Sequence, residues 1–140
     1  MKPQFLYSPE LVEAEWCKVG PHIDRVVSEA AHGEFDIADL YRLSLAGRML
    51  PFYVVDDNGE VFLAGLLEMV RYPAMTTINV VALGGERMME GAAVAWPPIV
   101  EFARHLGAKA IEASCSKAMA RLLRSALGFE PAYENVRFAL

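Results

Sequence analysis

The sequence predicts one α/β domain of the α+β kind, in which a mixed and mostly antiparallel sheet is flanked by helices. Three observations predict it: helical patterns fill residues 8–47, three strand patterns separated by turns fill 51–85, and helix and strand patterns alternate from 96 onward. Strands joined by short turns pair antiparallel, whereas a strand reached through a helix can join the same sheet in parallel. A chain of 140 residues is long enough for one such domain, which we assign to residues 1–140.

The first part of the chain predicts three helices. Ser8 is placed to cap the first helix with its side chain, and the Gly20-Pro21 pair is expected to stop it. Apolar residues recur over 23–31 with the spacing of an amphipathic helix, which His32-Gly33 is expected to end. A third helix is expected over 37–45, so that three separate helices precede the first strand.

Strand patterns fill the middle of the chain and return near its end. The runs 52–55 and 61–70 flank a turn at Asp56–Gly59, and 75–83 follows as a third strand. Beyond them the pattern predicts, in order, a helix at 96–106, a strand at 108–113, a helix at 117–127 and a final strand at 133–140.

Charge and composition argue against several classes of function. The net charge is −5 and the cationic side chains are scattered, whereas phosphate binding needs a concentrated cationic face, so we expect no nucleic-acid partner. The longest uncharged apolar stretches, 61–67 and 91–100, are shorter than the ~20 residues of a membrane span. The first seven residues lack an apolar core of signal-peptide length. We therefore expect no membrane association and a location in the cytoplasm.

The two cysteines, Cys17 and Cys115, are far apart in sequence and outside any C-x-x-C pattern. This spacing fits neither a disulfide framework nor a zinc site, so reduced structural thiols and no metal are expected. Cys115 is also a candidate nucleophile, but it would need a nearby base or cation to become a thiolate. The spacing of His22, His32 and His105 nominates none of them as that partner.

Glu68 is the other candidate catalytic residue, as a general base. It is the only carboxylate inside the three-strand meander, and burial of such a group favours proton transfer near neutral pH. In the third strand, Thr76, Thr77 and Asn79 carry no carboxylate, so none of them can hold a proton-accepting charge near neutral pH. The alternative interpretation is that Glu68 points to solvent.

Three segments resemble the GNAT (acyl-CoA N-acyltransferase) fold family. The predicted late helix ends in Leu127-Gly128-Phe129 before a last β segment, as in that family. The turn at 57–59 leads into a strand with Gly65 near its middle, which resembles the family's second-to-third-strand hairpin. Residues 88–93 stand where the family has its Gln/Arg-x-x-Gly-x-Gly/Ala pyrophosphate loop, with Gly91 and Ala93 matching. The chain is also similar, over most of its length, to small GNAT-like proteins encoded by bacteriophages, which implies a phage origin.

The resemblance implies a site for acetyl-CoA at this loop. Backbone amides at a helix N-terminus attract phosphate, and small residues let the ligand come close. The candidate cofactor-binding residues are Leu83, Gly84, Arg87, Gly91, Ala92 and Ala93.

The sequence departs from the family at three points of the acyl-transfer machinery. Met88 stands at the loop position that is usually Gln or Arg, and Arg124 stands where many members have a tyrosine acid. An arginine remains protonated, so Arg124 cannot supply a proton. Pro97-Pro98 is expected to delay the regular helix until about Trp96, which would move the amides away from Gly91.

Two hypotheses about function follow. The first is an acetyltransferase-like protein that has lost catalysis and works as a structural or adaptor module, attached to or incorporated in a phage virion with other virion proteins as partners. The second is an active acetyl-CoA-dependent N-acetyltransferase with an unidentified amine substrate. The sequence does not specify an oligomeric state.

Overall fold

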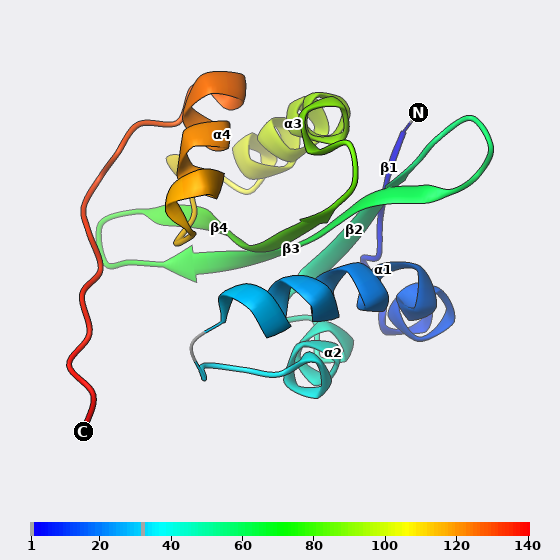
Figure 1. The fold of residues 1–140 in the computed structure, drawn as a ribbon, viewed down its shortest axis with the longest axis horizontal. Coiled ribbons are helices and arrows are strands. Elements are labelled where there is room, and N and C mark those ends of the chain that lie inside the picture. Colours follow the sequence, from blue (N-terminus) through cyan, green and yellow to red (C-terminus); the bar gives the residue numbers. More distant parts are fainter. Residues whose placement is uncertain (1, 32) are drawn as a thin grey trace.

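A single five-stranded sheet organises the computed structural model, which describes residues 2–31 and 33–140 (Figure 1). The strands lie in chain order: β1 (Pro3–Phe5), β2 (Leu50–Val55), β3 (Val61–Arg71), β4 (Thr76–Gly85) and β5 (Ala110–Glu112). Strands β1 to β4 pair antiparallel and β5 pairs parallel to β4. The predicted fold class, a mixed and mostly antiparallel sheet, is confirmed.

Two helices cover each face of the sheet. One face carries α1 (Pro9–Ala30) and α2 (Ile37–Leu45), and the other carries α3 (Met88–His105) and α4 (Lys117–Leu127) (Figure 1). Within the described ranges no helix is both long enough and apolar enough to cross a membrane.

The prediction that Gly20-Pro21 ends a first helix is wrong, because α1 continues through it as one helix of 22 residues. Ser8 caps its start as expected, accepting a hydrogen bond of 3.2 Å from the Leu11 amide. Proline removes an N–H and clashes with the preceding turn, which bends a helix without necessarily ending it. The two halves of α1 indeed run in different directions (Figure 1). Pro21 is exposed, while Val19 and Ile23 on either side are fully buried, so packing holds the helix together across the proline.

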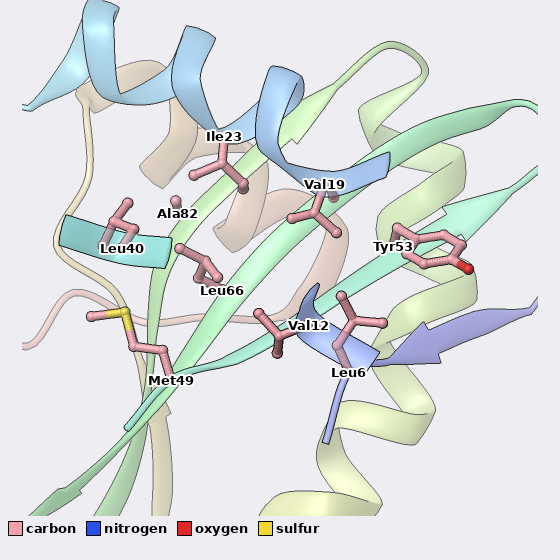
Figure 2. Close-up of a cluster of buried hydrophobic side chains, with 10 residues drawn as sticks. Leu6, Val12, Val19, Ile23, Leu40, Met49, Tyr53, Leu66 and Ala82 are labelled. Atoms are coloured by element: carbon pink, nitrogen blue, oxygen red, sulfur yellow. The ribbon is translucent and has the colours of Figure 1, made fainter. Parts of the chain in front are cut away.

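The buried core beneath α1 and α2 is mainly aliphatic. Val12, Val19 and Ile23 project from α1 toward the sheet and meet Leu66 and other residues there (Figure 2). The remaining buried members labelled in that figure are Leu6, Leu40, Met49, Tyr53 and Ala82. This layer fixes α1 and α2 over strands β2, β3 and β4.

On the opposite face α3 begins at Met88, eight residues before the expected start near Trp96. Pro97 and Pro98 lie inside this helix, and the apolar side that includes Ala95 and Ile99 is buried against the sheet. Tertiary packing therefore overrides the local penalty of the two prolines. The helix N-terminus therefore lies directly after β4, as the family resemblance implies. The expectation that Pro97-Pro98 moves the first helical amides away from Gly91 is wrong.

Close packing of α3 on β3 depends on Gly91. A Cβ atom at this position would lie 2.9 Å from Leu63 Cβ and 3.0 Å from the Phe62 ring. Gly85, just before the helix, has φ 148° and passes so close to the Phe62 carbonyl that a side chain would collide with backbone. These two glycines let the chain turn sharply from β4 and seat the start of α3 on the sheet.

The last helix ends as the sequence predicts. Ser116 Oγ accepts a hydrogen bond of 3.2 Å from the Met119 amide, and Gly128 terminates α4 in the left-handed conformation with φ 76°. The Phe129 amide then donates to the Leu123 carbonyl, and the Phe129 ring packs on Trp96 with centroids 5.2 Å apart. This ring contact ties the end of α4 to α3.

Two strand predictions fail at the ends of the chain. Residues 133–140 form no strand, although their sequence has strand periodicity, and β1 was not predicted because its three residues carry too little pattern. A strand exists only where an edge is available to pair with it, and sequence periodicity does not identify that edge. β1 pairs with the outer edge of β2, from Pro3 with Val54 to Phe5 with Phe52.

Substitution of Gly91 tests the close packing of α3 on β3. We expect Gly91→Val to lower the free energy of unfolding by about 2 kcal/mol, because the new side chain overpacks the contact with Leu63 and Phe62. The matched control is Ala93→Val in the same helix, where the residue is exposed and a change of about 0.5 kcal/mol is expected. Equal effects of the two substitutions in urea unfolding would contradict the proposed role of Gly91.

Candidate functional site

Strands β4 and β5 separate in the middle of β4, and the rest of β4 leads to the start of α3. They pair over three positions, the last joining Asn79 to Glu112, while β4 continues to Gly85. From Val80 onward, no strand of the described chain pairs with the β5 side of β4. Backbone N–H and C=O groups along an open edge are available to a ligand that carries amide groups. We call this divergence of the two strands the fork.

The N-terminus of α3 is the second feature of the site. The Gly91 amide donates the first helical hydrogen bond, to the Arg87 carbonyl at 2.9 Å. The amides of Met88, Met89 and Glu90 precede that bond and therefore have no carbonyl partner within the helix. Together with the helix dipole, three such amides form a site suited to an anion.

Arg87 caps this helix in the left-handed conformation, with φ 49° and ψ 45°. Its guanidinium donates to both carboxylate oxygens of Glu90, at 2.6 and 2.8 Å, and lies 3.8 Å from an Asp56 oxygen. It also stacks over the Phe62 ring at 4.7 Å. The hydrogen bonds from Arg87 hold the pKa of Glu90 below its ordinary value. The cation nearest the amides is thus engaged by carboxylates, and Glu90 places negative charge where an anion would bind.

The predicted cofactor-binding residues fall into two groups. Gly84, Gly91 and Ala92 are buried, and a Cβ at Gly84 would collide with Val26 of α1. These small residues are required by packing within the chain itself. Leu83 is partly buried in the α3 face of the core, so among the six only Arg87 and Ala93 are exposed. Their binding role stays a prediction.

Glu112, which the sequence reasoning did not select, occupies the fork. Its Oε1 atom accepts hydrogen bonds from the Tyr72 hydroxyl at 3.0 Å and from the Thr77 hydroxyl at 2.9 Å. The bond to Glu112 raises the pKa of the Tyr72 phenol. Two donors fix the carboxylate in place through one oxygen, and in the described chain no hydrogen bond engages Oε2. This is the arrangement of a positioned proton acceptor.

Glu68 lies in the same cross-strand row as Glu112. Asn79 pairs with Glu68 on one side and with Glu112 on the other. The neighbours of each in sequence pack toward α3, so all three side chains belong to the α1 and α2 face of the sheet. Glu68 is half-buried and lines a hollow of about 230 Å³ that Arg48 and Ser44 also border. The Glu68 side chain is thus neither fully exposed to solvent nor enclosed in the core.

Cys115 follows β5 and has a free, exposed side chain. Partial burial of the sulfur raises the pKa of its thiol, which favours the unreactive neutral form. His22 belongs to α1 and His105 to the last turn of α3, while His32 lies outside the described residues. These observations do not support covalent catalysis by Cys115.

Arg124 lies on the outer side of α4 and, with Arg121, borders an open hollow of about 660 Å³ between that helix and the segment at 129–131. Both arginines are exposed. Among the described residues, no group of three histidines, cysteines or carboxylates is placed to hold a metal ion.

A pattern in the sequence could have identified Glu112. It alternates with Ile111 in the strand predicted at 108–113, and such a strand places a lone carboxylate on the face opposite its apolar neighbour. The partners could not have been found this way, because Tyr72 and Thr77 lie 40 and 35 residues away in sequence.

Comparison with known proteins identifies the fold. No sequence profile of a known family matches the chain, and no curated protein matches it. An aminoglycoside acetyltransferase from an uncultured soil metagenomic sample has a similar structure, with a TM-score of 0.72 and 12% identity over 99% of this chain and 95% of that one. A Trypanosoma brucei acetyltransferase matches with a TM-score of 0.62 and 10% identity, over 99% of this chain and 100% of that one.

A Bacillus halodurans protein, solved as a tetramutant, matches over 100% of both chains with a TM-score of 0.69 and 12% identity. The chain therefore has an acetyltransferase-like fold. More particularly, it has the fold of the GNAT acetyltransferases, as the resemblance in its sequence implied.

The reactivity of Cys115 is predicted by its environment. In a Cys17→Ser variant, we expect the rate of alkylation by iodoacetamide to rise with pH along a curve whose midpoint is above that of a free cysteine, because burial raises the pKa of Cys115. The same curve measured in urea, where the chain is unfolded, should have the ordinary midpoint. A midpoint below the unfolded value would restore Cys115 as a candidate nucleophile.

Proposed function

We propose that this domain binds an acyl-CoA at the fork and transfers its acyl group to an amine, in the cytoplasm of the cell in which the chain is made. The observation that carries the proposal is the juxtaposition of the α3 N-terminus with the open edge of β4. The similarity of the fold to acetyltransferases supports it.

The chain's own donors fit the chemistry of this cofactor. The amides of Met88, Met89 and Glu90 suit the pyrophosphate, and the unpaired edge of β4 beyond Asn79 suits the amide groups of the pantetheine arm. When bound, acyl-CoA supplies a thioester carbonyl as the acyl donor. The Glu90 carboxylate repels the pyrophosphate, so we expect a dissociation constant for acetyl-CoA of about 10–500 μM rather than a lower one.

Glu112 is the base in this proposal. An amine must lose a proton when it becomes an amide, and the Oε2 atom of Glu112 is available to accept that proton. Tyr72 and Thr77 hold the carboxylate through Oε1. Arg124 remains protonated and takes no part in proton transfer, so water supplies the proton that the leaving thiolate acquires.

Calorimetry with acetyl-CoA and turnover with a panel of amines test the proposal. The panel should include sisomicin, since the soil acetyltransferase was crystallised with it.

Glu112→Gln should lower kcat/KM by about 100-fold or more and leave the dissociation constant for acetyl-CoA unchanged, because the amide still accepts from Tyr72 and Thr77 but cannot take up the proton. Glu68→Gln, in the same row, is the control and should lower kcat/KM much less. Equal losses in both variants would remove Glu112 from the role of base.

The charge at the α3 N-terminus gives a second test, which locates the cofactor. Glu90→Gln removes the carboxylate that competes with phosphate and releases Arg87, so it should tighten acetyl-CoA binding by about 2- to 5-fold. Arg87→Gln should weaken it. Unchanged affinity in both variants would place the cofactor elsewhere.

A non-catalytic role is the second candidate, and Met88 and Arg124 favour it because each replaces a residue that the family uses in acyl transfer. In that case the chain would be a structural or adaptor module associated with a phage virion. Absence of heat and of a thermal shift at millimolar acetyl-CoA would support this candidate over the first. Mass spectrometry of purified particles would then test for the chain at fixed stoichiometry.

A further inference from the structure

A hollow of about 230 Å³ lies at the end of the sheet where β2 begins, and we call it the edge hollow. Leu50 of β2 pairs with Leu67 of β3, and β3 continues to Arg71, so Glu68 and Met69 extend past the last position that is paired with β2. The connection before β2, the start of α1 and the C-terminal end of α3 surround these residues. The volume equals that of about eight water molecules, which suits a small organic ligand.

Backbone hydrogen bonds fix two walls of the edge hollow. At the end of α2 the Arg48 amide donates to the Leu43 carbonyl at 2.9 Å, across Gly47 in the left-handed conformation with φ 74°. This is a common way for a helix to end at a glycine, and it fixes the backbone of Arg48 at the border of the hollow. On the other side the Leu6 amide donates to the Pro51 carbonyl at 2.9 Å. The edge hollow is therefore formed before any ligand enters.

Apolar side chains make up most of the lining. The ones that belong to the core on the α3 side come from the two strands and from the end of α3: Leu50, Leu67, Met69, Phe102 and Leu106. All of these except Leu67 are only partly buried, so they retain surface for contact with a ligand. Such a lining binds the hydrocarbon part of a ligand by removing it from water.

Two opposite charges border the edge hollow without pairing. Glu68 is half-buried and Arg48 is exposed. In the part of the chain that the structure describes, neither side chain forms an ion pair or hydrogen bond, with the other or with a third residue. The two serines of the lining are engaged, because Ser44 donates to the Leu40 carbonyl at 2.8 Å and Ser8 caps α1. The charged groups left for a ligand are thus one carboxylate and one guanidinium.

We propose that the edge hollow binds a free α-amino acid with an apolar side chain. The ammonium group of the ligand lies against the Glu68 carboxylate, its carboxylate lies against the Arg48 guanidinium, and its side chain lies among the apolar residues. The two protein charges match those of an amino acid in sign and number, and hydrogen bonds between ionised groups are the strong ones. A ligand with a single charge leaves one protein charge unmatched, which makes the site selective.

The edge hollow is separate from the fork. Glu68 and Glu112 lie on either side of Asn79 in one row, so they are two strand spacings, or roughly 10 Å, apart. The start of α3 is farther away, because it follows Gly85, which pairs with Leu63 at the other end of the β3–β4 ladder. The amino acid is therefore a second ligand, and its binding does not depend on the acyl transfer proposed above.

Calorimetric titration of the 140-residue chain with L-leucine and L-phenylalanine, in the absence of acyl-CoA, tests the proposal. We expect a dissociation constant of about 20–500 μM for at least one of the two. Isopentylamine and isocaproate are leucine without its carboxylate and without its ammonium group, and phenethylamine and hydrocinnamate are the same pair for phenylalanine. Each analogue should bind at least about 10-fold more weakly than its parent, because it loses one of the two charged contacts. No binding of either amino acid at about 10 mM, or an analogue that binds as tightly as its parent, would overturn the proposal.

Two conservative variants locate the bound amino acid. Glu68→Gln and Arg48→Gln each remove one charge from the edge hollow, so each should weaken binding by about 10-fold or more. Glu101→Gln and Arg42→Gln are the matched controls, since both residues are exposed and outside the hollow, and their affinity should equal that of the unsubstituted chain. Circular dichroism with thermal unfolding verifies that all four variants are folded. Unchanged affinity in either Glu68→Gln or Arg48→Gln, or an equal loss in the controls, would refute recognition by these two charges.

Discussion

The contact between Gly91 of α3 and Leu63 of β3 is the constraint on which the candidate site depends. Because Gly91 has no side chain, the first turn of α3 lies directly on the sheet, and because Gly85 has none, the chain can turn sharply from β4 into that helix. The amides of Met88 to Glu90, which have no partner within the helix, thereby follow directly on the part of β4 that is left unpaired beyond Asn79.

Two different polar systems border the unpaired part of β4. On the α3 side the amides attract an anion while the Glu90 carboxylate opposes it, and Arg87 partly offsets that charge. On the α1 and α2 side, Glu112 is held by Tyr72 and Thr77 at the last paired position of β5. The sheet separates the two systems, and the fork is the opening between them. This division suits a reaction in which the anionic acyl-CoA and the amine that receives its acyl group approach from opposite faces of the sheet.

Sequence reasoning predicted the elements better than their continuity. The cap at Ser8 and the ending at Gly128 were confirmed because the first depends on a local hydrogen bond and the second on a left-handed residue. The breaks expected at Pro21 and at Pro97-Pro98 were wrong, since buried neighbours such as Ile23 and Ile99 hold those helices together across the prolines. The Glu112 site was missed because its partners come from a loop and a strand far away in sequence. The strand expected over residues 133–140 pairs with no strand of the described sheet, since periodicity alone does not form a ladder.

Mapping acetyl-CoA by amide chemical shifts of the ¹⁵N-labelled chain tests the central claim most directly. The account predicts that the largest shifts fall on Met88, Met89 and Glu90 at the start of α3 and on Val80 to Leu83 at the open edge of β4. Smaller shifts are expected at Arg121 and Arg124, where the open hollow on α4 offers only surface charge. Shifts confined to α4, with the start of α3 unaffected, would contradict the assignment of the cofactor site to the fork.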